Sequence, residues 1–194
     1  MTLGITGGMG CGKSTVAKML HRSGFQLLDS DALIREQVLT NPEVITALRD
    51  RFGPKVINAN GLIDRGHLAA QVFANDQDRE WLEELTHPRV FELWRQALRS
   101  APEANWVIEV PLLFEKQLEN WFDFIVCVAS SPDLQLARLE QRGIPRPLAE
   151  QRISKQLPLA TKTAHSDIVL WNDGSIDFLQ KQVNAMIADL PKPV

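Results

Sequence analysis

The feature that most constrains this chain is a glycine-rich run near its start, TGGMGCGKST at residues 6–15. An apolar stretch, LGITG (3–7), leads into this run, a helical pattern follows it, and the run itself matches G-x-x-x-x-G-K-[ST] in full. Glycines let the backbone turn with positive φ, so that successive N–H groups point inward and bind an anion at a helix N-terminus. The sequence therefore predicts a loop that binds the phosphates of a nucleoside triphosphate.

The residues of this loop are expected to divide the work of holding ATP. Lys13 places a positive charge on the outer phosphates, and Ser14, with Thr15 beside it, offers a hydroxyl ligand to Mg²⁺. Cys11 is given no catalytic role. The other predicted ATP-binding positions contribute loop backbone and are Gly8, Gly10, Cys11 and Gly12.

Strands that alternate with helices predict an open α/β sheet. Near-continuous apolar runs are typical of strands covered on both faces, as in parallel sheets. Helical patterns begin at Lys13 and cover 134–142 and 175–190, where Ser175 is a natural N-cap. The candidate strands are LGITG (3–7), FQLLDSD (25–31), WVIEVPLL (106–113), DFIVCVAS (123–130) and DIVLW (167–171).

The gap between the second and third candidate strands, residues 32–105, is predicted to be mostly helical. Asn41 and Pro42 are expected to open one helix as its cap and first-turn residue. The segment 78–98 is predicted to hold two helical stretches separated at Pro88. We therefore expect a core of residues 1–31 and 106–194 that carries a helical insertion over 32–105.

Composition sets limits on the class of protein. The 194 residues carry a net charge of −3, so neither nucleic acid nor an anionic membrane is an expected partner. No apolar run is long enough to span a bilayer, and we see no signal peptide. The two cysteines, Cys11 and Cys127, form no C-x-x-C pair, which favours a reduced, cytoplasmic protein without a disulfide or zinc site. A monomer or weak homo-oligomer is expected.

The phosphate loop alone does not settle the class of nucleotide-dependent protein. A GTPase should show N-K-x-D, which is absent, and DRFG (50–53) lies in a helical pattern. A small-molecule kinase and an ATP-driven motor or switch remain. A motor would use an acid at the end of a second strand, and Glu109 fits this role poorly because it is expected inside its strand.

Two acids end the second candidate strand in LLDSDALIR (27–35). A carboxylate beside the phosphate loop can orient an acceptor hydroxyl and take its proton. An acid at a strand-to-helix junction is also a routine N-cap, so the residues leave both roles open for Asp29 and Asp31. Arg35, one turn further on, is a candidate to bind an anionic part of the acceptor.

A basic segment follows the fourth candidate strand. Arg138 and Arg142 lie four residues apart, and RGIPRPLAEQRISKQLP (142–158) adds further cations between prolines. We expect a lid over about 140–160, in which Arg138 and Arg142 neutralise charge on the transferring phosphoryl group. The alternative is a solvated charged face with intrahelical ion pairs.

Together these residues resemble the dephospho-CoA kinase family, and the resemblance covers essentially the whole chain. It rests on motifs in the family's order and spacing: TGGMGCGKSTVA, LDSDALIR, THPRV, VIEVPLLFE and SDIVLWNDGS. The resemblance implies a P-loop kinase of the nucleoside monophosphate kinase type, with a five-stranded parallel sheet, a helical substrate-binding insertion and a lid. The implied reaction moves the γ-phosphoryl group of ATP to the ribose 3′-hydroxyl of dephospho-CoA, the last step of CoA synthesis.

The resemblance also implies roles for single residues, with ATP and dephospho-CoA as partners and Mg²⁺ as cofactor. Asp31 becomes the general base, Lys13 the phosphate clamp, and Asn172 a residue that lies toward the ATP base. The residues implied to lie toward the acceptor are Asp31, Arg35, His87, Arg89, Pro111, Leu112 and Leu113.

Overall fold

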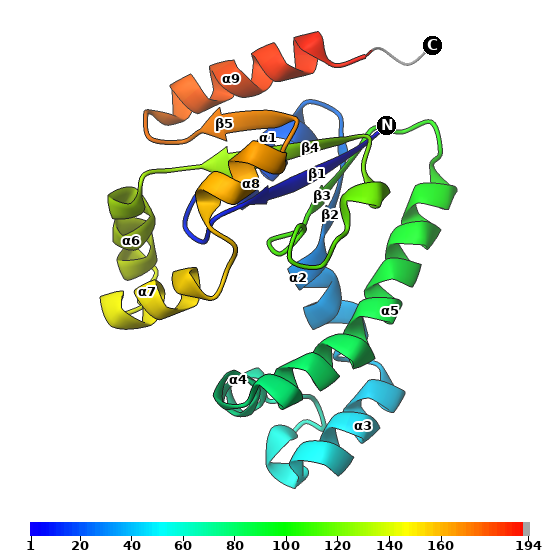
Figure 1. Ribbon diagram of the computed structural model, residues 1–194. Helices are drawn as coiled ribbons and strands as arrows, with labels where there is room; N and C mark the ends of the chain where they lie inside the picture. Colours follow the sequence, from blue (N-terminus) through cyan, green and yellow to red (C-terminus); the bar gives the residue numbers. More distant parts are fainter. Residues whose placement is uncertain (192–194) are drawn as a thin grey trace. The chain divides into compact units, whose positions relative to one another are not determined.

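The structure is a computed structural model that describes residues 1–191 (Figure 1). The end of the predicted core range, 192–194, lies outside the described residues. The chain divides into two compact units, Met1–Leu28 with Glu103–Val194, and Asp29–Pro102. Each division falls three residues earlier in the sequence than the boundary expected from the pattern.

The first unit is built on a five-stranded sheet in the order β2-β3-β1-β4-β5. Strand β1 pairs in parallel with β3 on one side and β4 on the other, and β4 pairs in parallel with β5. The predicted five-stranded parallel sheet is confirmed, although its strands are shorter than the apolar runs. Their bounds are β1 (Thr2–Gly7), β2 (Gln26–Asp29), β3 (Trp106–Glu109), β4 (Phe124–Ala129) and β5 (Ile168–Trp171).

Helices cover both faces of this sheet, which is why nearly every residue of its central strands β3, β1 and β4 is buried. Helices α1 and α9 pack against one face, where Leu3 and Ile5 of β1 are fully buried, and α8 packs against the other (Figure 1). Gly4 faces the second side, where a Cβ would lie 2.8 Å from the Phe122 ring. The bounds are α1 (Lys13–Arg22), η3 (Glu119–Trp121), α6 (Pro132–Gln141), α7 (Arg146–Ser154), α8 (Leu159–His165) and α9 (Ile176–Asp189).

Helix ends in the first unit follow local sequence signals. Gly24, just beyond α1, has φ +99° and stops that helix as predicted. Ser175 caps α9, because its hydroxyl accepts a hydrogen bond from Phe178 N at 3.2 Å. Among the described residues, no helix has the length and apolar character needed to cross a membrane.

The second unit is helical, as the sequence predicts. Asn41 caps α3 by accepting from Glu43 N at 2.9 Å, and Pro42 is its first residue. The elements are α2 (Ser30–Leu33), the π-helical η1 (Ile34–Val38), α3 (Pro42–Phe52), the 3₁₀ turn η2 (Pro54–Val56), α4 (Arg65–Ala74) and α5 (Asp76–Ser100).

The predicted helix break at Pro88 is wrong. One helix, α5, runs from Asp76 to Ser100 and passes through Pro88. Side chains around the proline supply hydrogen bonds to nearby carbonyls: Thr86 Oγ1 donates to Leu82 O at 2.8 Å, and an Arg89 guanidinium nitrogen donates to Leu85 O at 3.0 Å. These side-chain bonds go to carbonyls on either side of Glu84 O, the carbonyl that an N–H at position 88 would use, and the helix continues past the proline.

Candidate active site

The glycine loop leaves β1 at Gly7 and enters α1 at Lys13. Three of its glycines have positive φ: Gly7 at +137°, Gly10 at +82° and Gly12 at +96°. A Cβ on Gly10 would lie 2.7 Å from Gln135 O, so the loop backbone also packs too closely for a side chain there. The loop therefore requires glycine for both its turn and its packing.

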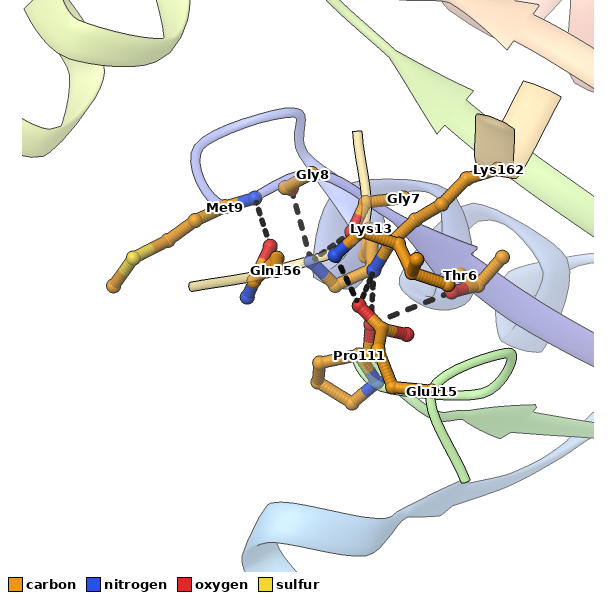
Figure 2. Close-up of polar contacts among 10 residues, drawn as sticks. Thr6, Gly7, Gly8, Met9, Lys13, Pro111, Glu115, Gln156 and Lys162 are labelled. Carbon is orange, nitrogen blue, oxygen red and sulfur yellow. Dashed lines mark hydrogen bonds and ion pairs between the residues drawn. The ribbon is translucent and has the colours of Figure 1, made fainter. Parts of the chain in front are cut away.

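Lys13 and Ser14 begin α1, and both side chains turn toward the loop and the strand ends. The Lys13 side chain is buried, and its Nζ donates to Gly7 O at 3.2 Å and Gly8 O at 3.1 Å (Figure 2). Ser14 Oγ donates to Glu109 Oε1 at 3.0 Å. A hydroxyl and a carboxylate oxygen thus lie side by side beside the phosphate loop, and both are ligand types that Mg²⁺ prefers.

Glu109 is the last residue of β3, and this position corrects the expectation that it lies inside the strand. The strand ends four residues earlier than its apolar run, because Val110 and Pro111 already belong to the following loop. Glu109 is buried, and its partner across the sheet is Ile5 of β1, the strand that leads into the loop. Parallel pairing with β1 therefore brings the Glu109 carboxylate to the phosphate loop.

Arg138 and Asn172 support the loop by hydrogen bonds to its backbone carbonyls. The Arg138 guanidinium donates to Gly10 O at 3.3 Å and to Asn172 O at 2.7 Å. Asn172 Nδ2 donates to Cys11 O at 2.9 Å. Both residues therefore contact the loop backbone; the catalytic role of Arg138 and the position of Asn172 toward the ATP base stay predictions.

Cys11 is buried within the loop. Burial raises the pKa of its thiol above the ordinary value, and the positive charge of Lys13 opposes part of that rise. Cys11 N donates to Gly8 O at 3.2 Å. A protonated, buried thiol agrees with a position that serves through its backbone rather than as a nucleophile.

The predicted lid begins at a sharp turn. Helix α6 ends at Gln141, Arg142 follows it with an exposed side chain, and Gly143 has φ +79° before α7 begins at Arg146. Among the described residues, no heavy atom beyond its two chain neighbours lies within 4 Å of where a Gly143 Cβ would be, so the glycine serves the turn and not a close contact.

The two acids that end β2 have different surroundings. Asp29 caps α2, because its Oδ1 accepts from Ala32 N at 2.9 Å. Asp31 lies within α2 with an exposed side chain, and the exposed Arg35 pairs with Glu36 at 3.1 Å. The capping role thus belongs to Asp29, and the role of Asp31 as general base stays a prediction.

His87 and Arg89 lie on α5, and both α2 and η1 pack against this helix. The His87 ring lies 5.8 Å from that of Phe91, centroid to centroid. Arg89 reaches Glu43 Oε2 at 3.1 Å through the guanidinium that also binds the helix backbone. The second unit therefore gathers the elements that carry its four predicted acceptor residues.

The predicted acceptor turn of the first unit, Pro111 to Leu113, is held by hydrogen bonds to the carbonyl of Pro111. Pro111 O accepts from Lys162 Nζ at 2.9 Å and from Thr6 Oγ1 at 3.4 Å (Figure 2). Pro111 and Leu112 are half-buried, whereas Leu113 is fully buried beside Gly4. Contact of this turn with an acceptor stays a prediction.

Sequence reasoning missed a polar network around Glu115. Glu115 Oε1 accepts from Lys162 Nζ at 2.8 Å and from Leu157 N at 3.0 Å, while Gln156 Oε1 accepts from Met9 N at 3.2 Å (Figure 2). Glu115 is the last residue of the motif VIEVPLLFE, so the motif could have indicated that Glu115 belongs to the site. Gln156 and Lys162 carried no such signal, because their partners are far away in the sequence.

The parallel sheet with β1 at its centre, and the glycine loop that delivers Lys13 and Ser14 to the strand ends, define a P-loop kinase. Comparison with known proteins narrows this class. The model of the dephospho-CoA kinase family matches residues 1–177, and this chain belongs to that family. The chain is therefore an ATP-dependent kinase of CoA biosynthesis that phosphorylates dephospho-CoA.

Individual relatives agree with this assignment along the chain. A dephospho-CoA kinase from Thermosynechococcus vestitus is 42% identical over 186 residues, which are 95% of this chain and 92% of that protein. A crystal structure of a Thermus thermophilus protein has a TM-score of 0.84 and 32% identity, and covers 99% of this chain and 98% of its own. A Campylobacter jejuni dephospho-CoA kinase has the same fold, with a TM-score of 0.72, 23% identity, and coverage of 97% and 96%.

Proposed function

We propose that this chain transfers the γ-phosphoryl group of ATP to the ribose 3′-hydroxyl of dephospho-CoA, with its phosphate loop as the site of transfer. The observation that supports this most is the position of Lys13, Ser14 and Glu109 at the ends of β1 and β3. One cation and two oxygen ligands lie there beside an anion-binding loop. Phosphoryl transfer depends mainly on positioning and charge stabilisation, which this set supplies.

Lys13 is the proposed clamp on the outer phosphates. Its ammonium is held by two loop carbonyls at the strand end, so the loop backbone sets its position. A preorganised charge needs no rearrangement when negative charge moves in the transition state. Lys13 therefore acts on the rate of transfer as well as on ATP binding.

Ser14 and Glu109 are the proposed supports for Mg²⁺. A Mg²⁺ ion held here with ATP would supply positive charge that offsets the charge of the phosphates. Ser14 Oγ offers the ligand, and Glu109, 3.0 Å away, orients that hydroxyl as its hydrogen-bond acceptor. Partners of this kind orient metal ligands and raise metal affinity.

Asp31 is the proposed general base. Asp29 is the residue that caps α2, and Asp31, two residues further on, is the acid whose carboxylate would accept the proton of the acceptor hydroxyl. The predicted acceptor cations, Arg35 and Arg89, and the predicted contacts from His87 and from Pro111 to Leu113 would hold the pyrophosphate and arm of dephospho-CoA. Binding energy from these parts places the 3′-hydroxyl in line with the phosphoryl group.

The segment 140–160 is the proposed lid, with Gly143 as its hinge. Arg142 beside the hinge is the proposed cation that closes over the phosphates, and Arg138 holds the loop against residue 172. A closed lid keeps water away from the γ-phosphoryl group. We also propose a cytoplasmic location, which agrees with two free, buried cysteines. A monomer or weak homo-oligomer is proposed as well.

A comparison of acceptors tests this function. Release of ADP is measured with dephospho-CoA and, in parallel, with AMP, CMP, shikimate, gluconate and adenosine as acceptors. Adenosine carries the same hydroxyl without the pyrophosphate arm, so we expect much slower turnover with it than with dephospho-CoA. Equal turnover of adenosine and dephospho-CoA would contradict the proposed role of the acceptor residues.

A further inference from the structure

We propose that Gln156 is a positioning residue for Lys13 and acts through one peptide group of the phosphate loop. Gln156 follows the lid helix α7, and its Oε1 accepts a hydrogen bond from Met9 N at 3.2 Å, across 147 positions of sequence (Figure 2). The inference rests on the proposed role of Lys13 at the outer phosphates. It assigns a task to a residue that lies outside the glycine motif.

The peptide group in question joins Gly8 to Met9. Its carbonyl, Gly8 O, accepts from Lys13 Nζ at 3.1 Å and from Cys11 N at 3.2 Å, and its N–H is the donor to Gln156. The C=O and N–H of a trans peptide point in opposite directions. Lys13 and Gln156 therefore hold the two ends of one rigid plane.

This plane is a weak point of the loop without Gln156. Rotation of a peptide group changes ψ of the residue before it and φ of the residue after it, and glycine at the first position permits many ψ values. A rotated Gly8–Met9 peptide would turn Gly8 O away from Lys13 Nζ. The hydrogen bond to Gln156 opposes this rotation, so it keeps the Lys13 ammonium at its place in the loop.

The backbone next to Gln156 is anchored, so the side-chain amide of Gln156 extends from a fixed position. Leu157 N donates to Glu115 Oε1 at 3.0 Å, and the same oxygen pairs with Lys162 Nζ at 2.8 Å. The Lys162 side chain is 0% exposed and also donates to Pro111 O. Since a buried ammonium is stable only with such partners, this cluster fixes the chain where the lid ends.

The test compares the variant Gln156→Met with Lys13→Ala and with the double variant. Methionine has a similar size but accepts no comparable hydrogen bond, and Gln151→Met is the matched control at an exposed position of α7. We expect Gln156→Met to lower kcat by about 10- to 10²-fold, with the KM for dephospho-CoA within about twofold of the original. In the Lys13→Ala background, the same change should alter kcat by less than about twofold.

A second measurement reports the hydrogen bond itself. Amide exchange of Met9, followed by nuclear magnetic resonance, should become faster in Gln156→Met and stay unchanged in Gln151→Met. Additive losses in the double variant would overturn the inference, because Gln156 would then act independently of Lys13. Unchanged kcat or unchanged Met9 exchange would overturn it as well. If Lys13→Ala alone leaves kcat intact, the proposed role of Lys13 fails, and this outcome is separate from the others.

Discussion

Ser14 Oγ and Glu109 Oε1 lie 3.0 Å apart, although 95 positions of sequence separate the two residues. The parallel register explains the short distance. Glu109 ends β3 opposite Ile5 of β1, and β1 continues through the glycine loop into α1, where Ser14 lies. Ser14 brings a hydroxyl to the phosphate loop, and Glu109 sets the direction of that hydroxyl by accepting its hydrogen bond. The pair links the phosphate loop to the sheet at the point where Mg²⁺ is proposed to bind.

Loss of the Glu109 carboxylate should weaken the use of Mg²⁺. In Glu109→Gln the amide no longer offers a charged acceptor to Ser14 Oγ, so we expect the Mg²⁺ concentration for half-maximal turnover to rise about 10-fold or more. A titration of turnover against Mg²⁺ at saturating ATP measures this shift. Glu119→Gln, at an exposed position, is the control, and identical titrations for both variants would remove Glu109 from the metal site.

Lys13 should be needed for turnover and not for folding. Its ammonium donates to the carbonyls of Gly7 and Gly8 in a polar loop, so Lys13→Ala should leave the thermal transition nearly unchanged. We expect kcat to fall by about 10²- to 10³-fold, as is typical when one preorganised donor to the transition state is lost. Lys18→Ala, exposed on the same helix, should keep full activity. Unfolding of Lys13→Ala or near-normal turnover would argue against the assignment.

Asp29 and Asp31 should separate into a cap and a base. Asp31→Asn should lower kcat by about 10²- to 10⁴-fold with ATP binding intact, because the amide accepts no proton. Asp29→Ala should instead cost about 1 kcal/mol of stability through the lost cap on α2. Turnover, ATP binding and the free energy of unfolding are measured on both variants. A larger rate loss at Asp29 would reverse the two roles.

Cys127 should make the protein less stable at high pH. Burial in β4, with a smaller contribution from Cys11, raises the pKa of the Cys127 thiol from 9.0 to about 11. The unfolded chain therefore loses this proton at a lower pH than the folded one, and the free energy of unfolding falls between about pH 9 and about pH 11. Urea unfolding of the wild type and Cys127→Ala across this range measures the difference. Parallel pH profiles for the two proteins would contradict the shift.

Local patterns carried much of the fold and part of the site. The glycine loop, the five strands of the parallel sheet, and the caps at Asn41 and Ser175 all follow from short runs of sequence, and the structure confirms them. The helical secondary structure of the insertion (32–105) is predictable as well, because its apolar residues recur at helical spacing. Turns, helix caps and helical periodicity depend on residues that are close together in the sequence, so they can be predicted from it.

What the sequence left out depends on contacts between distant segments. The apolar run places Glu109 inside its strand because such a run does not show where the strand ends, and pairing with β1 decides that end. The pattern predicts a break at Pro88 because proline lacks the N–H of an α-helix, yet the helix continues through it. The pattern assigns no role to Gln156, because its partner, Met9 N, lies 147 positions away.

The most direct test of the whole account is the stoichiometry of ATP use with and without dephospho-CoA. ADP and the phosphorylated product are quantified together, in the presence of Mg²⁺, on the wild type and on Asp31→Asn. We predict slow ATP hydrolysis alone, and with dephospho-CoA a fast reaction that forms one CoA for each ADP and is lost in Asp31→Asn. Rapid ATP hydrolysis that is independent of dephospho-CoA would contradict the account and favour an ATP-driven switch built on the same loop and Glu109.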